Sequence, residues 1–119
     1  MYAGEWEYGS MQGYGEYTWR EGKKYLGYYN NNKQEGFGIC YNSKPLKIYI
    51  GFWKNGKNEG ISKYISNHSI KYIKWDMNRK DAVYSNNTIN ILDEMKPEQR
   101  KFYSFFCFDI NKISLLFSA

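Results

Sequence analysis

Polar and apolar positions alternate with a period of two at the start of the chain. In the stretch "YAGEW", Tyr2, Gly4 and Trp6 would lie on one face of an extended strand and the residues between them on the other. The polar link "EYGSMQ" follows and carries Gly9, which suits the positive φ of a tight connection. The pattern therefore predicts the first half of a β-hairpin.

This alternating block recurs along the chain, and a second block recurs with it. The first block reads "YAGEW" at 2–6, "YLGYY" at 25–29 and "YIGFW" at 49–53. The second begins eleven residues after each leading tyrosine and reads "GYG" at 13–15, "GFG" at 36–38 and "GIS" at 60–62. Two linked blocks that recur three times predict a series of hairpins in which each unit contacts its neighbours.

The glycines of the repeat are interpreted as structural. Asn32 stands where the other two units carry Gly9 and Gly56 in their turns, and asparagine also tolerates positive φ. The remaining repeat glycines are expected to leave room for aromatic rings from neighbouring strands. They are Gly4, Gly13, Gly15, Gly27, Gly36, Gly38, Gly51 and Gly60. A phosphate-binding loop is excluded, because that loop would need a following helix.

These units resemble the MORN repeat (membrane occupation and recognition nexus), whose pattern is roughly Tyr-x-Gly-x-Trp, a glycine turn and Gly-x-Gly. The resemblance extends over about residues 2–64. It divides the chain into units 2–24, 25–48 and 49–71. The resemblance implies a mainly β fold, in which successive hairpins form one elongated, single-layer antiparallel sheet.

A fourth unit is interpreted as degenerate. Tyr72 follows Tyr49 by 23 residues, but the diagnostic Gly and Trp residues are replaced in the stretch that follows. Terminal repeats are often atypical, so residues 72–85 are expected to form a capping hairpin. The predicted repeat sheet then spans residues 2–85.

Residues 86–119 differ in character from the repeats. Pro97 suits the first position of a helix, and apolar residues then recur at helical spacing. They are Phe102, Phe105, Phe106, Ile110, Ile113 and Phe117. We expect a connector and a C-terminal amphipathic helix that caps the open end of the sheet. Docking of this helix on a partner or a membrane, and a poorly ordered tail, are the alternatives.

Composition supports a single-layer sheet rich in aromatic rings, and it limits which kinds of partner and cofactor are expected. Aromatic residues make up 20% of the chain, and large rings can stabilise a single layer. The net charge of +5 comes from scattered Lys and Arg without a dense stripe, so no nucleic-acid partner is expected. Cys40 and Cys107 lack companions at zinc spacing, so no metal or other cofactor is expected. Both are interpreted as free, buried thiols of a reducing cytoplasm.

No residue pattern predicts catalysis. His68, the single histidine, has no identifiable carboxylate or nucleophile neighbour in the sequence. Four glutamates recur at related positions, where cross-strand pairing with lysine is the simpler interpretation. They are Glu5, Glu16, Glu35 and Glu59. We therefore expect no enzymatic activity.

The aromatic face of the hairpins is the candidate binding surface. Its rings would flank a trough of small residues at regular steps. The predicted partner-binding residues are Tyr2, Trp6, Tyr25, Tyr29, Tyr49 and Trp53. The expected partner is an extended or helical segment of another protein. Packing of the rings only on one another, as core, is the alternative.

The predicted function is a non-enzymatic protein-interaction scaffold. MORN proteins are commonly associated with cytoskeletal, ciliary and cortical assemblies, so the resemblance implies a cytoplasmic protein at the cytoskeleton or a cilium. A membrane-surface adaptor that binds anionic phospholipid is the alternative, and the dispersed lysines favour the scaffold. Met1 directly precedes the first unit, so the strand at 2–7 is also expected to offer an unpaired edge for strand pairing.

Overall fold

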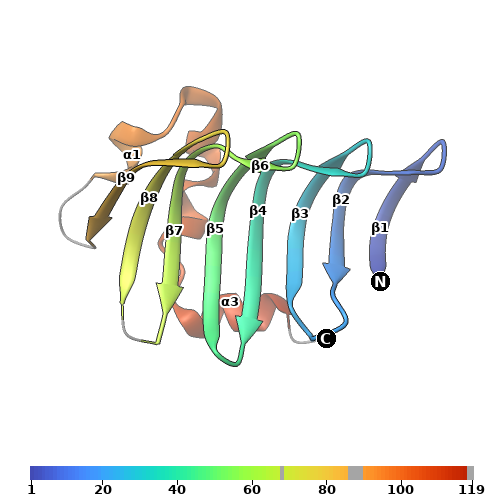
Figure 1. The fold of residues 1–119 in the computed structure, drawn as a ribbon, viewed down its shortest axis with the longest axis horizontal. Coiled ribbons are helices and arrows are strands. Elements are labelled where there is room, and N and C mark those ends of the chain that lie inside the picture. Colours follow the sequence, from blue (N-terminus) through green and yellow to red (C-terminus); the bar gives the residue numbers. More distant parts are fainter. Residues whose placement is uncertain (68, 86–89, 118–119) are drawn as a thin grey trace.

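One antiparallel sheet of nine strands dominates the computed structural model, which describes residues 1–67, 69–85 and 90–117 (Figure 1). His68 lies outside these described residues. The strands are β1 Tyr2–Glu7, β2 Ser10–Thr18, β3 Lys24–Asn30, β4 Lys33–Ser43, β5 Leu46–Lys54, β6 Lys57–Asn58, β7 Gly60–Ser66, β8 Ile70–Asp76 and β9 Arg79–Ser85. They pair in chain order, except that the two-residue β6 pairs only with β5. The predicted elongated sheet of successive hairpins is confirmed.

Four hairpins are closed by two-residue turns of one kind. Both central residues of each turn have positive φ. These pairs are Tyr8-Gly9 (φ 50 and 79), Asn31-Asn32 (50 and 67), Asn55-Gly56 (51 and 80) and Met77-Asn78 (49 and 72). Two positive φ values define the type I′ turn, whose twist matches that of the flanking strands. The positive φ predicted at Gly9, Asn32 and Gly56 is confirmed, and the fourth unit has an equivalent turn.

The fourth hairpin begins one residue earlier than the tyrosine spacing suggested. Cross-strand pairing continues the row of leading tyrosines at Lys71, which pairs with Tyr64. Tyr72 lies on the opposite face and is buried there. In this register Trp75 stands four residues after the leading position, as the second aromatic does in the other units. The apolar ring of Tyr72 is thus placed in the core, and the exposed lysine takes the other face.

The C-terminal region forms four short helices instead of one long amphipathic helix. They are α1 Ile91–Glu94, the 3₁₀-helix η1 Pro97–Phe102, α2 Tyr103–Phe106 and α3 Ile110–Phe117. The predicted single helix is interrupted before Asp109, whose carboxylate accepts a hydrogen bond from the Lys112 backbone N–H at 2.9 Å and so begins α3. Among the described residues no helix has the length and apolar character needed to cross a membrane.

The helices lie across one face of the sheet, so the expectation that they cap its end is wrong (Figure 1). Phe37 stacks on Phe102 with ring centroids 4.5 Å apart, and Tyr41 stacks on Phe117 at 5.0 Å. The buried core joins Phe37, Ile39, Ile48, Ile50, Phe52, Ile61, Ile65 and Tyr72 of the strands to Ile91, Met95, Phe106, Ile113 and Phe117 of the helices. Burying the apolar side chains on this face away from water stabilises the fold, and short helical segments can each pack their apolar side chains against the sheet. We call this the covered face and its opposite the open face.

Candidate functional site: the open face of the sheet

A row of residues in cross-strand register defines the open face. It runs through Tyr2, Tyr17, Tyr25, Cys40, Tyr49, Tyr64 and Lys71, one from each strand from β1 to β8 apart from β6. A second row lies beside it and begins with Gly4, Gly15, Gly27, Gly38 and Gly51. Successive members of both rows are about 4.8 Å apart, the spacing of hydrogen-bonded strands. The open face is therefore a ladder of rings beside a track of glycines.

The leading tyrosines of the first two units lie flat across this glycine track. A Cβ atom at Gly15 would overlap the ring of Tyr2, and one at Gly38 would overlap the ring of Tyr25. Each hydroxyl donates a hydrogen bond to the backbone carbonyl three residues later, from Tyr2 to Glu5 at 3.0 Å and from Tyr25 to Tyr28 at 3.3 Å. The two rings are thereby held against the backbone by contact and by hydrogen bonding.

For three other glycines the expectation that they leave room for a ring is wrong, and it is their backbone conformation that requires glycine. Gly13, Gly36 and Gly60 have φ values of 75, 84 and 77, in the left-handed region that side chains other than glycine rarely adopt. At Gly36 the added Cβ would meet nothing within 4 Å. The first glycine of the Gly-x-Gly block thus provides backbone conformation and the second provides space for a ring.

Each leading tyrosine also packs on the second aromatic of the next unit. The ring centroids of Tyr2 and Tyr29 are 5.2 Å apart, and those of Tyr25 and Trp53 are 5.3 Å apart, both edge to face. Tyr29 and Trp53 are therefore 6% and 7% exposed. Among the described residues Trp6 of the first unit meets only one ring, that of Tyr2 in its own unit, with centroids 5.1 Å apart, and it is 59% exposed. Repeat packing thus decides which aromatics remain accessible.

The six predicted partner-binding residues all lie on the open face, but the structure divides them. Tyr25, Tyr29 and Trp53 are buried in one another and form a small second core. Tyr2, Trp6 and Tyr49 are the accessible ones. The environment of the buried three matches the alternative interpretation of the sequence, in which the rings pack on one another as core. Tyr25, Tyr29 and Trp53 therefore support the surface from beneath, and Tyr2, Trp6 and Tyr49 form its accessible part.

Ser62 changes the packing in the third unit. It replaces the second glycine of the block, and its hydroxyl oxygen accepts a hydrogen bond from the Trp75 indole N–H at 2.9 Å. The ring of Tyr49 therefore does not lie across the backbone as its two counterparts do; its centroid is 5.0 Å from that of Tyr64 and 6.2 Å from that of Trp75. Burial raises the pKa of Tyr49 to about 12. The neighbouring rings of Tyr49 and Tyr64 thus form an aromatic ridge on the open face.

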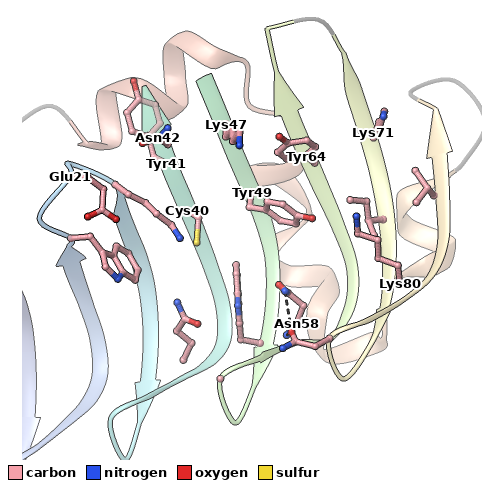
Figure 2. A pocket seen from close by; sticks show the side chains of 18 residues that line it. Glu21, Cys40, Tyr41, Asn42, Lys47, Tyr49, Asn58, Tyr64, Lys71 and Lys80 are labelled. Carbon is pink, nitrogen blue, oxygen red and sulfur yellow. Dashed lines mark hydrogen bonds between the residues drawn. The ribbon is translucent and has the colours of Figure 1, made fainter. Parts of the chain in front are cut away.

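A groove of about 920 Å³ runs along the ridge formed by Tyr49 and Tyr64 (Figure 2). Figure 2 shows the helices behind the sheet and the lining side chains in front of it. The lining residues come from the strands β4 to β9, from two of the hairpin turns and from the link before β3. Tyr49, Trp53 and Tyr64 supply rings, and Asn58 and Asn78 supply amides that are hydrogen-bonded to each other at 3.2 Å. The groove is large enough for a peptide segment or a small ligand.

The charged residues of the groove are mainly basic. Lys23, Lys47, Lys71 and Lys80 line it, against the single carboxylate of Glu21. In the sequence these lysines are far apart and appear dispersed. Cross-strand pairing brings them to one face, which the linear pattern did not reveal. A signal was nevertheless present, since Lys71 falls 22 residues after Tyr49, close to the repeat period.

The two cysteines are free and lie on different elements. Cys40 is half-buried on the open face, where burial raises the pKa of its thiol to about 11. Cys107 is exposed beside α2, so the expectation that both thiols are buried is wrong for Cys107. Within the described ranges no cluster of three or more His, Cys, Asp or Glu residues could hold a metal ion.

Comparison with known proteins agrees with the repeat geometry. A family model described as the MORN repeat matches residues 2–24, 25–44 and 49–65, together half of the chain. A search of curated proteins gives no match. The matched stretches contain the leading tyrosines, the ring-bearing glycine track and the first three type I′ turns.

Proposed function

Because the chain belongs to the MORN repeat family, we propose that it is a protein-interaction module that holds an extended partner segment in the groove of its open face. MORN repeats are non-enzymatic modules generally involved in protein or membrane interactions. The finer proposal is a scaffold role in a cytoskeletal or ciliary assembly of the cytoplasm.

The observation that supports the proposal is that the two faces of the sheet differ in burial. The chain's own helices bury the covered face from β4 to β8, whereas the open face of these strands keeps a groove lined by half-buried tyrosines. Half-buried aromatic residues beside polar groups are typical of interface anchors. The rings that support the groove are locked by edge-to-face contacts, so little ordering is needed on binding.

A photo-crosslinking experiment tests the proposal. The crosslinker benzoylphenylalanine replaces Tyr64 in the groove or, as a matched control, Tyr8 in the first hairpin turn, which is 98% exposed and does not line the groove. Both positions carry an aromatic residue, so the substitution is conservative at each. In native cells we expect Tyr64→benzoylphenylalanine to give a discrete crosslinked polypeptide that the Tyr8 variant does not give. The same products from both positions, or none from Tyr64, would contradict it.

Membrane docking is the second candidate, and the gathering of four lysines on one face favours it. In that role the lysines would meet anionic headgroups, and binding would weaken as salt shortens the Debye length. Co-sedimentation with phosphatidylserine vesicles at low and high salt tests it. Binding that is absent at low salt would exclude this candidate.

A further inference from the structure

The positive charges of the groove lack partners of their own. Among the described residues the ion pairs formed by Lys24, Lys74 and Arg79 neutralise basic groups elsewhere in the protein. In the same part of the chain no carboxylate lies within ion-pair distance of the lysines that line the groove. Basic residues outside the groove also lack an ion pair among the described residues, but the groove gathers four such ammonium groups on one surface. An incoming group with carboxylates would find these ammonium groups unpaired.

Aromatic faces hold two of these lysines at opposite sides of the groove. The Lys23 ammonium lies 4.7 Å from the Trp19 ring centroid, and that of Lys80 lies 5.7 Å from the Trp75 ring centroid. Such contacts restrict where the ammonium lies. Lys47 and Lys71 stand between them, on β5 and β8 (Figure 2). The charges thus follow the groove across the sheet.

The dimensions fit a short extended chain. The groove crosses the strands from β4 to β9, a span of about 19 Å at the usual strand spacing, which about six residues of extended chain cover. Lys47 and Lys71 are separated by two strand spacings and by two residues along the strand, about 12 Å in all, or about three to four extended residues. A bilayer surface is flat and reaches only the rim of a hollow, whereas a single chain can enter it.

We propose that the occupant of the groove is an extended acidic segment of a partner protein, whose carboxylates meet Lys23, Lys47, Lys71 and Lys80. This inference rests on the proposed function and adds the chemistry of the partner. The half-buried rings of Tyr49 and Tyr64 pack against the segment between the charges. Attraction between opposite charges then sets the preference for acidic over neutral segments.

Two lysine variants test the inference. The groove variant carries Lys47→Gln, Lys71→Gln and Lys80→Gln. Its matched control carries Lys33→Gln, Lys44→Gln and Lys57→Gln, which remove the same charge from exposed lysines outside the groove. The probes are two fluorescein-labelled peptides of about ten residues, one alternating Glu with Val and one alternating Gln with Val. Binding is followed by fluorescence anisotropy, and circular dichroism checks that both variants stay folded.

We expect the Glu peptide to bind the parent chain about tenfold more tightly than the Gln peptide. The groove variant should lose about tenfold in affinity for the Glu peptide, while the control variant stays within about twofold. Equal binding of both peptides, or equal losses in both variants, would overturn the inference. Phosphatidylserine vesicles that displace the Glu peptide through the same three lysines would also overturn it, in favour of a lipid.

Failure of this inference can be told apart from failure of the proposed function. If the crosslink from Tyr64→benzoylphenylalanine persists in the groove variant while the peptides bind equally, the groove holds a partner without acidic preference. If that crosslink is absent from the parent chain as well, the proposed function itself is wrong.

Discussion

The ring of Tyr25 meets the ring of Trp53 edge to face, with centroids 5.3 Å apart and ring planes at 83°. These residues belong to consecutive units, so the contact ties one hairpin to the next. Tyr25 is fully buried and Trp53 is 7% exposed, although both lie on the open face. The cohesion of the array on this face therefore depends on contacts between the leading tyrosine of one unit and the second aromatic of the next.

Truncation of the two tryptophans should have unequal effects on stability. Trp53→Ala removes a buried ring and should lower the free energy of unfolding by about 3–5 kcal/mol. Trp6→Ala removes a ring that is 59% exposed and should cost about 1 kcal/mol or less. Urea denaturation followed by circular dichroism measures both. Equal losses would mean that the difference in burial does not decide how much each tryptophan stabilises the fold.

A double-mutant cycle tests the glycine track. Gly38→Ala places a methyl group where the Tyr25 ring lies and should destabilise the protein by about 1–3 kcal/mol. In a Tyr25→Ala background the ring is gone, so adding Gly38→Ala should cost far less. The coupling free energy, measured by urea denaturation, is expected to be about 1–3 kcal/mol. Additive effects would show that Gly38 is required for some other reason.

Alkaline pH should destabilise the protein through Tyr25. Burial raises the pKa of Tyr25 above its ordinary value of 10.0, so in the folded state its proton is retained after the unfolded chain has lost it. The stabilising contribution is complete below the unfolded pKa and is lost progressively as the pH rises above it. Tyr25→Phe should therefore flatten the decline in unfolding free energy above about pH 10. The same decline in parent and variant would exclude Tyr25 as its source.

Strand pairing at the β1 edge stays a prediction. Met1 and Thr18 exchange two backbone hydrogen bonds, at 2.7 and 2.8 Å, so the N–H and C=O groups of Tyr2 and Gly4 point to the outer side. A strand added there would also cover Trp6. We expect sedimentation to show self-association as concentration rises, with tryptophan emission moving to shorter wavelength. A monomer with unchanged emission across the range would argue against pairing of this chain with itself.

Local pattern sufficed for the hairpins themselves. The period-two alternation and the repeat of Tyr-x-Gly-x-Trp predicted successive antiparallel strands, and the residues of the turns predicted positive φ. Both properties are set by neighbouring residues, because side-chain alternation and turn geometry act within a few positions of the chain. Family membership follows from the same short patterns.

Tertiary structure decided the rest, because it depends on residues that are distant in the chain. The interruption at Asp109 lets short helices cover one face, which the apolar spacing of a single helix did not predict. Lys71, rather than Tyr72, takes the leading position of the fourth unit because cross-strand register places each side chain on one face or the other. Register also gathers scattered lysines into one groove and buries Trp53 under a ring from the preceding unit. The sequence by itself determined the repeating hairpin; packing between hairpins and helices determined which face stays open and what charge it carries.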